Sequence, residues 1–463
     1  MNAIGSPMHP PAMLDLAEAA AALGGRVEGA NVPFSGVATD SRRLSAGDLF
    51  VALEGERFDG HRFVEEAARR GAAAALTMRR VDSAIPVAQL LVADTRLALG
   101  RLAAHWRSRF QLPLVALTGS NGKTTVKEML GAILAAHCGS RDAVLATSGN
   151  LNNDIGMPLT LLALRPAHRF AVIEMGMNHE GEIDYLTRIA QPTVALVNNA
   201  QRAHLGMLGS LEAVARAKGE IYAGLGEHGH AVVNADDPFA PYWEGLNAGR
   251  PVVTFGFAAD AQVRAVPAGA GWQLRTPAGA FVVSLRVAGE HNVRNALAAC
   301  AAAHALAIPT AAMQAALAAF CGVPGRLQRR AGPGASTLID DTYNANPESM
   351  KAALKVLAAE RGRRVFVMGD MGELGAQSAA MHAEVGEFAR RQGIEALLAV
   401  GEESRSAVRA FGAGARHFSD LAALLAAARE EAEGGATLLV KGSRFMQMER
   451  VADALAGGKA DAV

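Results

Sequence analysis

The sequence predicts an α/β protein of three domains, and three observations support this fold class. The chain of 463 residues is too long for one ordinary hydrophobic core, since domains average about 150 residues. Short apolar runs typical of strands alternate with helical stretches along most of the chain. Pro113 and the segment Gly322-Val323-Pro324-Gly325 interrupt this alternation. We therefore expect domains at residues 1–110, 111–323 and 324–463.

The N-terminal domain is predicted to be a small α/β unit. Residues 13–23 and 95–109 have the apolar spacing of helices. Short apolar runs predict four strands, at residues 37–39, 49–53, 73–77 and 89–92.

The central domain is predicted to be a P-loop ATPase-like unit with a mostly parallel sheet and helices on its faces. Strands that alternate with helices favour this arrangement, because parallel strands need crossover connections. The predicted strands are residues 114–117, 170–173, 193–197, 231–233, 252–255 and 281–287.

The C-terminal domain continues the alternation in the manner of a Rossmann-like fold. Its strands are expected at residues 337–339, 364–368, 396–400 and 437–440. The domain contains no G-x-G-x-x-G run, so the fold alone predicts no cofactor there.

Charge and composition exclude several classes of partner. Lys+Arg and Asp+Glu balance at 45 each, and no basic run is present, so neither nucleic acid nor an anionic membrane is expected. No signal peptide is evident, and apolar stretches such as residues 296–308 are too short to span a bilayer. The cysteines, Cys138, Cys300 and Cys321, are too widely separated for a disulfide framework. We expect a protein of the reducing cytoplasm, without membrane insertion, that binds small ligands in a cleft.

The most informative run is Gly119-Ser120-Asn121-Gly122-Lys123-Thr124-Thr125, between an apolar strand and a predicted helix. Such a run is typical of a phosphate-binding loop: the backbone N–H groups and helix N-terminus bind anionic oxygens, Lys123 contacts terminal phosphates, and Thr124 binds Mg²⁺. The common spacing would place a glycine at Leu117, so the loop is a shortened variant. A glycine turn with an incidental lysine is the alternative.

Polar residues directly after predicted strands are further candidates, because ligands of open α/β sheets bind beyond the carboxyl ends of the strands. Glu174 follows the strand at 170–173 and is predicted to be a metal ligand beside the loop, with helix capping as the alternative. His204 lies after Asn198-Asn199 and could be either a ligand or an ordinary surface histidine.

Lys218 lies on the apolar face of a predicted helix over residues 211–222. It follows Val214 by four residues and precedes Ile221 by three. An ammonium group there must reach solvent, find an anion, or lose its charge through a lowered pKa or a covalent modification. We favour a functional role.

Three segments farther on also carry polar groups. His291 and Asn292 open an alanine-rich helix, where capping alone would explain them. Arg326 at the second domain boundary is placed to reach a phosphate when domains close. The run Asp340-Asp341-Thr342-Tyr343-Asn344-Ala345-Asn346-Pro347 holds more polar side chains than a turn needs.

Taken together, the order of these motifs resembles that of the Mur ligases over nearly the whole chain. The matching segments are residues 119–125, Glu174, His204-Leu205-Gly206, residues 289–295, Gly325-Arg326 and residues 341–347. Within the family, residues 340–347, 368–375 and 440–444, with Met448-Glu449, are similar to members that use D-alanyl-D-alanine as the amine.

The resemblance implies an ATP-dependent amide ligase with Mg²⁺, in which Lys123, Lys218 and His204 are catalytic. It implies that Thr124, Glu174, His204 and Lys218 serve the metal sites, Lys218 after N-carboxylation. Residues 119–125, His291, Asn292, Asn295, Arg326 and Asp341 would bind ATP. Ser41 and Arg42, Tyr343, Asn344 and Asn346 would bind the substrates, UDP-N-acetylmuramoyl-tripeptide and D-alanyl-D-alanine. A monomer is expected.

Two alternatives stay open at this stage. One is a related amide ligase, such as a folylpolyglutamate synthase or the diaminopimelate- or lysine-adding Mur ligase, although the Asp-Asn-Pro-Arg run of the diaminopimelate-adding ligase is missing here. The other is a nucleotide-hydrolysing switch. A ligase should release phosphate only when both peptide substrates are present, whereas a switch would do so with a protein partner.

Overall fold

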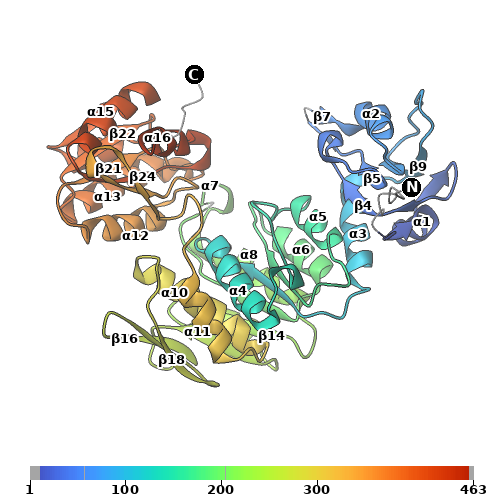
Figure 1. Ribbon diagram of the computed structural model, residues 1–463, viewed down its shortest axis with the longest axis horizontal. Coiled ribbons are helices and arrows are strands. Elements are labelled where there is room, and N and C mark those ends of the chain that lie inside the picture. Colours follow the sequence, from blue (N-terminus) through green and yellow to red (C-terminus); the bar gives the residue numbers. More distant parts are fainter. Residues whose placement is uncertain (1–10, 57, 204, 458–463) are drawn as a thin grey trace, which may run out of the picture.

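The computed structural model describes residues 11–56, 58–203 and 205–457 and contains three main sheets. Figure 1 shows the central domain between the N-terminal and C-terminal domains, which lie at opposite ends of the molecule. The α/β class and the arrangement in three domains expected from the sequence are confirmed.

The N-terminal domain has a five-stranded sheet in the order β2-β9-β8-β5-β4. Only β2 is antiparallel to its neighbour. The predicted helix at 13–23 begins later than expected, because Leu14–Asp15 (β1) pairs with Pro33–Phe34 (β3) and Asp15 caps α1. The remaining bounds are α1 Leu16–Leu23, β2 Arg26–Glu28, β4 Gly36–Ala38, β5 Asp48–Val51, α2 Val64–Arg69, β8 Ala74–Thr77, β9 Ala88–Leu91 and α3 Thr95–Arg107.

The central domain has a nine-stranded sheet in the order β11-β12-β10-β13-β14-β15-β16-β17-β18. Its strands are β10 Leu114–Thr118, β11 Val144–Ala146, β12 Phe170–Glu174, β13 Val194–Val197, β14 His230–Asn234, β15 Val252–Gly256, β16 Val263–Ala268, β17 Gly271–Thr276 and β18 Gly279–Val283. The strands β11 to β16 are parallel, and β10, β12 and β13 are fully buried.

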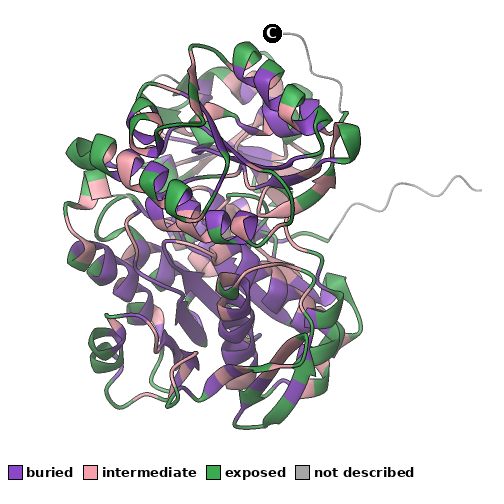
Figure 2. Cartoon of the chain, turned by 90° about the vertical axis from the view of Figure 1, so that its left-hand side faces the viewer, coloured by how far each residue is buried: buried purple, intermediate pink, exposed green. Residues whose placement is uncertain are grey.

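Helices cover both faces of this sheet. One face packs on α4 Lys123–Cys138, α10 Glu290–Ala305 and α11 Thr310–Ala319. The other packs on α5 Gly156–Leu162, α6 Glu182–Ala190 and α8 Leu211–Gly219, together with α3 of the N-terminal domain. Two further helices are α7 Leu205–Leu208 and α9 Ala240–Leu246. Figure 2 shows buried residues concentrated along the strands and the inner faces of the helices.

The strand predicted at 281–287 was expected to belong to the parallel sheet, and this expectation is wrong. The strand is β18, and it ends an antiparallel meander with β16 and β17 instead of joining the parallel part. The turns at residues 269–270 and 277–278 are too short for a parallel crossover, which needs a dozen or more residues.

The C-terminal domain has a six-stranded sheet in the order β19-β20-β24-β21-β22-β23, in which only β19 is antiparallel. Its elements are β19 Gln328–Ala331, β20 Thr337–Asp340, α12 Pro347–Ala358, β21 Arg364–Met368, α13 Ser378–Arg391, β22 Ala396–Val400, α14 Arg405–Phe411, β23 Ala415–Phe418, α15 Leu421–Glu433, β24 Thr437–Lys441 and α16 Glu449–Leu455. Within the described ranges, no helix is both long and apolar enough to cross a membrane.

Candidate functional site

A cleft of about 2420 Å³ runs between the three domains and contains most of the predicted site residues. The central domain contributes the phosphate-binding loop and the residues after β12, β13 and β14. The C-terminal domain contributes the segment after β20 and one side of α12 along its length, and the N-terminal domain contributes the start of α3. The carboxyl ends of the parallel strands therefore face a space large enough for several ligands.

The phosphate-binding loop joins β10 to α4 as predicted. Gly122 has a φ of 80° and stands at the N-cap of α4, where a Cβ atom would lie 2.6 Å from Asn198 Nδ2 and closer still to Asn295 Oδ1. Lys123 donates to the Gly119 carbonyl at 2.7 Å, and burial lowers the pKa of its ammonium group. Any residue other than glycine at position 122 would therefore be strained, and the loop has the geometry expected of an anion-binding turn.

Thr124 and Glu174 lie together next to the loop. Thr124 Oγ1 donates to Glu174 Oε2 at 2.9 Å, and Asn152 Nδ2 donates to Glu174 Oε1 at 2.8 Å. The Glu174 carboxylate therefore contacts side chains and does not cap a helix. Hydroxyl, carboxylate and amide oxygens are the donors that Mg²⁺ prefers, so this set fits the predicted cation.

Lys218 is buried on α8, and burial lowers the pKa of its ammonium group well below the usual value, with Lys123 adding repulsion. Among the described residues, it has no hydrogen-bond or ion-pair partner, and it is not in the lining of the cleft. The prediction that its side chain does not simply reach solvent is consistent with this burial. The neighbouring prediction, His204, lies outside the described residues.

The start of α10 borders the cleft behind the loop. Asn295 accepts from Asn198 Nδ2 at 3.1 Å, and Asn292 donates to the Ala288 carbonyl at 2.8 Å. His291 is mostly enclosed, and burial lowers its pKa to about 4, so the ring is neutral at neutral pH. The N-cap of α10 is Gly289, so His291 and Asn292 are not the capping residues.

Residues of the C-terminal domain meet the loop across the cleft. Arg326 Nη2 donates to Thr124 Oγ1 at 2.8 Å, and its guanidinium group lies 4.1 Å from the Tyr343 ring centroid. Asn346 Nδ2 donates to Asn121 Oδ1 at 2.9 Å. Within the described part of the chain, Arg326 Nε is buried without a hydrogen-bond partner, which leaves a cationic donor for a ligand.

Asp341 and Asn344 are held by a residue that the sequence prediction did not select. Lys441, at the end of β24, pairs with Asp341 Oδ2 at 2.5 Å and donates to the Asn344 carbonyl at 2.8 Å. Asn152 and Asn198 were missed in the same way. Lys441 ends β24 and Asn198 directly follows β13, so their position at the carboxyl edge of a sheet was the available signal, whereas Asn152 lies in a loop six residues after β11.

Ser41 and Arg42 are not brought to the cleft. Arg42 is exposed and pairs with Asp40 at 2.8 Å, and neither residue is part of the cleft lining. The Arg42 guanidinium group lowers the pKa of Asp40 to about 2. A nucleotide bound at these two residues would occupy the N-terminal domain away from the phosphate-binding loop.

Comparison with family models matches all three domains. Residues 33–107 match the model "Mur ligase family, catalytic domain", residues 117–303 match "Mur ligase middle domain", and residues 325–444 match "Mur ligase, glutamate ligase domain".

Comparison with individual proteins finds relatives that match end to end. UDP-N-acetylmuramoyl-tripeptide–D-alanyl-D-alanine ligase of Escherichia coli is 46% identical over 94% of this chain and 96% of its own. MurF from Acinetobacter baumannii superposes with a TM-score of 0.90 at 39% identity, over 98% of this chain and all of that one. MurF ligase from Thermotoga maritima, solved in complex with ADP, gives a TM-score of 0.79 at 28% identity over 91% and 97%.

Proposed function

Because this chain belongs to the Mur ligase family, we propose that it joins D-alanyl-D-alanine to UDP-N-acetylmuramoyl-tripeptide in an ATP-dependent reaction. The product is the UDP-linked pentapeptide precursor of peptidoglycan. The observation that carries this proposal is the phosphate-binding loop facing Arg326 and Asn346 across a cleft that three domains line. The end-to-end similarity to ligases of this name supports it.

The reaction divides into two steps because a carboxylate is a poor electrophile. A terminal carboxylate oxygen of the tripeptide attacks the γ-phosphorus of ATP, and ADP leaves. The amine of D-alanyl-D-alanine then attacks the acyl carbon, inorganic phosphate leaves, and the amine loses a proton. The acyl phosphate must be kept from water, which a cleft closed by the C-terminal domain would do.

The residues of the loop supply positioning and charge for the first step. Lys123 and the loop N–H groups would bind the β- and γ-phosphates, with Arg326 on the opposite side. Thr124 and Glu174 would hold Mg²⁺, which neutralises phosphate charge when it is bound. Asp341, His291, Asn292 and Asn295 would bind the rest of ATP.

Lys218 and His204 would complete the metal site. A neutral lysine amine can add to CO₂, forming an N–C bond and releasing a proton, and the carbamate is an anionic oxygen ligand. The lowered pKa of Lys218 favours the neutral amine that this addition needs. The same modification would convert a buried amine into an anion that a metal ion can pair with.

The two substrates would bind on different domains. Ser41 and Arg42 are proposed for the uridine nucleotide, and Tyr343, Asn344 and Asn346 for the dipeptide side. We propose that the enzyme acts as a monomer in the cytoplasm.

A phosphate-release assay tests the function. We expect release from ATP only when UDP-N-acetylmuramoyl-tripeptide and D-alanyl-D-alanine are both present, with one amide formed for each phosphate released. Steady release without the dipeptide would refute the ligase assignment and favour a hydrolytic switch. Running the assay with single amino acids as acceptors separates this ligase from its relatives.

A further inference from the structure

The C-terminal and N-terminal domains contact the central domain through different kinds of interaction. The N-terminal and central domains share one apolar cluster, which α3 crosses. The two apolar clusters of the C-terminal domain are separate, and in the described part of the chain only Leu205 and Ala288 of the central domain pack against them. Its placement therefore depends mainly on polar contacts, which allow domain motion more readily than a shared core.

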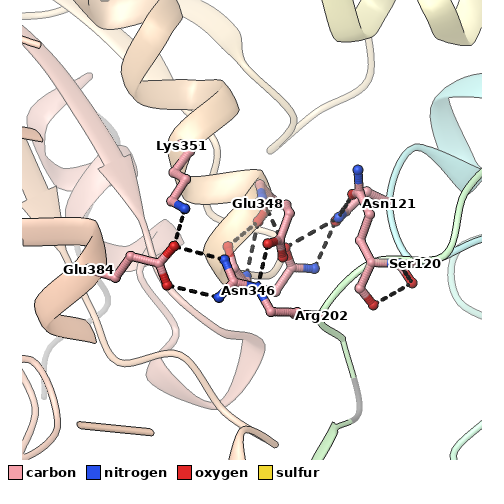
Figure 3. Close-up of polar contacts among 9 residues, drawn as sticks. Ser120, Asn121, Arg202, Asn346, Glu348, Lys351 and Glu384 are labelled. Carbon is pink, nitrogen blue, oxygen red and sulfur yellow. Dashed lines mark hydrogen bonds and ion pairs between the residues drawn. The ribbon is translucent and has the colours of Figure 1, made fainter. Parts of the chain in front are cut away.

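The strongest of these polar contacts centres on Arg202, in the loop between β13 and α7 (Figure 3). Arg202 Nε donates to Glu348 Oε1 at 2.6 Å. Its two terminal nitrogens donate to the two oxygens of Glu384 at 2.8 and 3.0 Å. Glu348 lies in the first turn of α12 and Glu384 in α13, so one guanidinium group joins two helices of the C-terminal domain.

The charges of this cluster balance. Lys351 of α12 also pairs with Glu384, so two cations meet two carboxylates. The hydrogen bonds from Arg202, with the charge of Lys351, lower the pKa of Glu384 to about 2. The side chains of Arg202, Glu348 and Glu384 are 28%, 26% and 34% exposed, and such half-buried bidentate pairs contribute more than exposed ones.

The Arg202 cluster is adjacent to the phosphate-binding loop on both sides of the domain boundary. The neighbouring Gln201 accepts from Asn121 Nδ2 at 2.6 Å and exchanges hydrogen bonds with Ser120 Oγ at 2.9 and 3.0 Å. On the C-terminal side of the boundary, Asn346 at the N-cap of α12 contacts Asn121. Asn346 lies two residues before Glu348 in the sequence. Through Glu348, Arg202 thus binds the same end of α12 that contacts the loop.

We propose that Arg202 is a positioning residue that holds the C-terminal domain against the phosphate-binding loop through Glu348 and Glu384. Without this contact the domain spends less time in the arrangement that brings Asn346 and Arg326 to the loop. The fraction of competent molecules falls, and apparent affinity falls with it. Only the kinetic consequence rests on the proposed ligase function; the contact between domains does not.

Hydrogen–deuterium exchange of the full chain without ligands tests the contact itself. In Arg202→Gln we expect faster amide exchange in residues 199–203 and 343–349 than in the wild type. The matched control is Arg363→Gln, because Arg363 makes a comparable pair with Glu431 inside the C-terminal domain, outside the cleft. Equal exchange in Arg202→Gln and in the control would overturn the proposal.

Steady-state kinetics test the positioning role. At low salt, we expect kcat/KM for D-alanyl-D-alanine to fall about tenfold in Arg202→Gln, in the range of coupled charge pairs at interfaces. Arg202→Lys should restore part of the loss, and the difference should shrink at about 1 M salt, where screening is strong. Arg363→Gln should match the wild type. A loss that persists at high salt, or that appears equally in the control, would refute the electrostatic contact.

A second variant covers the case in which Arg202→Gln does not fold. Glu384→Gln should change exchange and kinetics in the same direction, and the double variant should lose less than the sum of the two single losses, since both single variants remove the Arg202–Glu384 contact. Additive losses would contradict the proposal. If the wild type makes no amide product, the ligase function fails, while the exchange data still decide the role of Arg202.

Discussion

At the scale of single residues, Lys218 is a buried lysine whose environment disfavours its charge. Lys127 offers a direct comparison, because it is also buried but donates to the Thr147 carbonyl at 2.6 Å and pairs with Glu128 at 2.8 Å. The ammonium group of Lys127 therefore contacts a carbonyl and a carboxylate oxygen, whereas the ammonium group of Lys218 has no such partner among the described residues. This difference is the reason for proposing a functional role for Lys218.

We predict that Lys218→Ala abolishes ligation and that short carboxylates such as formate or acetate partly restore it, because they can replace a carbamate at the metal. Lys127→Met should lower the melting temperature, and added carboxylate should not rescue any loss of activity. Both variants are measured by phosphate release with and without the added anion. Full activity of Lys218→Ala would exclude the carbamate.

His291 gives a prediction for pH dependence. Burial lowers its pKa to about 4, and Lys441 and Arg294 act in the same direction against Asp341. Between pH 6.5 and 4 the unfolded chain binds a proton at this histidine and the folded chain does not. The free energy of unfolding therefore decreases as the pH is lowered through this window, by up to about 3 kcal/mol. In His291→Gln, urea midpoints should depend less on pH over that range. Equal pH profiles would show that burial does not govern this histidine.

At the scale of elements, the junction of β10 and α4 depends on Gly122. Gly122→Ala should weaken ATP binding at least about tenfold and lower stability by about 1–3 kcal/mol, since the added Cβ meets Asn198 and Asn295 and the backbone is left-handed. Gly139, at the other end of α4, has a φ of 73° with nothing within 4 Å of an added Cβ. Gly139→Ala should therefore cost about 1 kcal/mol and leave ATP binding unchanged. Calorimetric titration checks both, and equal ATP affinities in the two variants would contradict the steric argument.

Elements differ in how far the sequence could predict them. β10, β12 and β21 are buried apolar runs, so their composition alone marks them as strands. β19 (Gln-Arg-Arg-Ala) is half exposed and polar, and it forms only because β20 pairs with it, so no local signal marks it. The β16 and β17 hairpin was missed for a related reason, since its few buried residues are separated by partly buried or exposed ones and form no continuous apolar run.

The same distinction applies to the site. The loop from Gly119 to Thr125 is local in sequence, so its chemistry could be predicted. Arg202 could not be assigned, because Glu348 and Glu384 lie 146 and 182 residues away and only the docked domain brings them together. Ser41 and Arg42 stay predictions, because their proposed ligand would bind outside the cleft.

At the scale of the whole molecule, the apolar clusters and not the predicted domain boundaries should determine which parts unfold together. α3 packs on α5 and α6, and Trp106 Nε1 donates to the Leu164 carbonyl at 3.1 Å across that boundary. The N-terminal and central domains should therefore unfold together, while the C-terminal domain, with its own cores, should unfold separately.

Scanning calorimetry of the unliganded full chain tests this expectation. Leu102 in α3 and Leu439 in β24 are both fully buried, so replacing either by alanine should cost about 2–5 kcal/mol. Leu102→Ala should lower the transition of the N-terminal and central domains as one unit and leave the C-terminal transition in place. Leu439→Ala should do the reverse. If Leu102→Ala splits off a small transition of the N-terminal domain alone, the shared cluster does not couple the two domains. Arg202→Gln should move the two transitions further apart, because it removes one of the contacts that join the C-terminal domain to the larger unit.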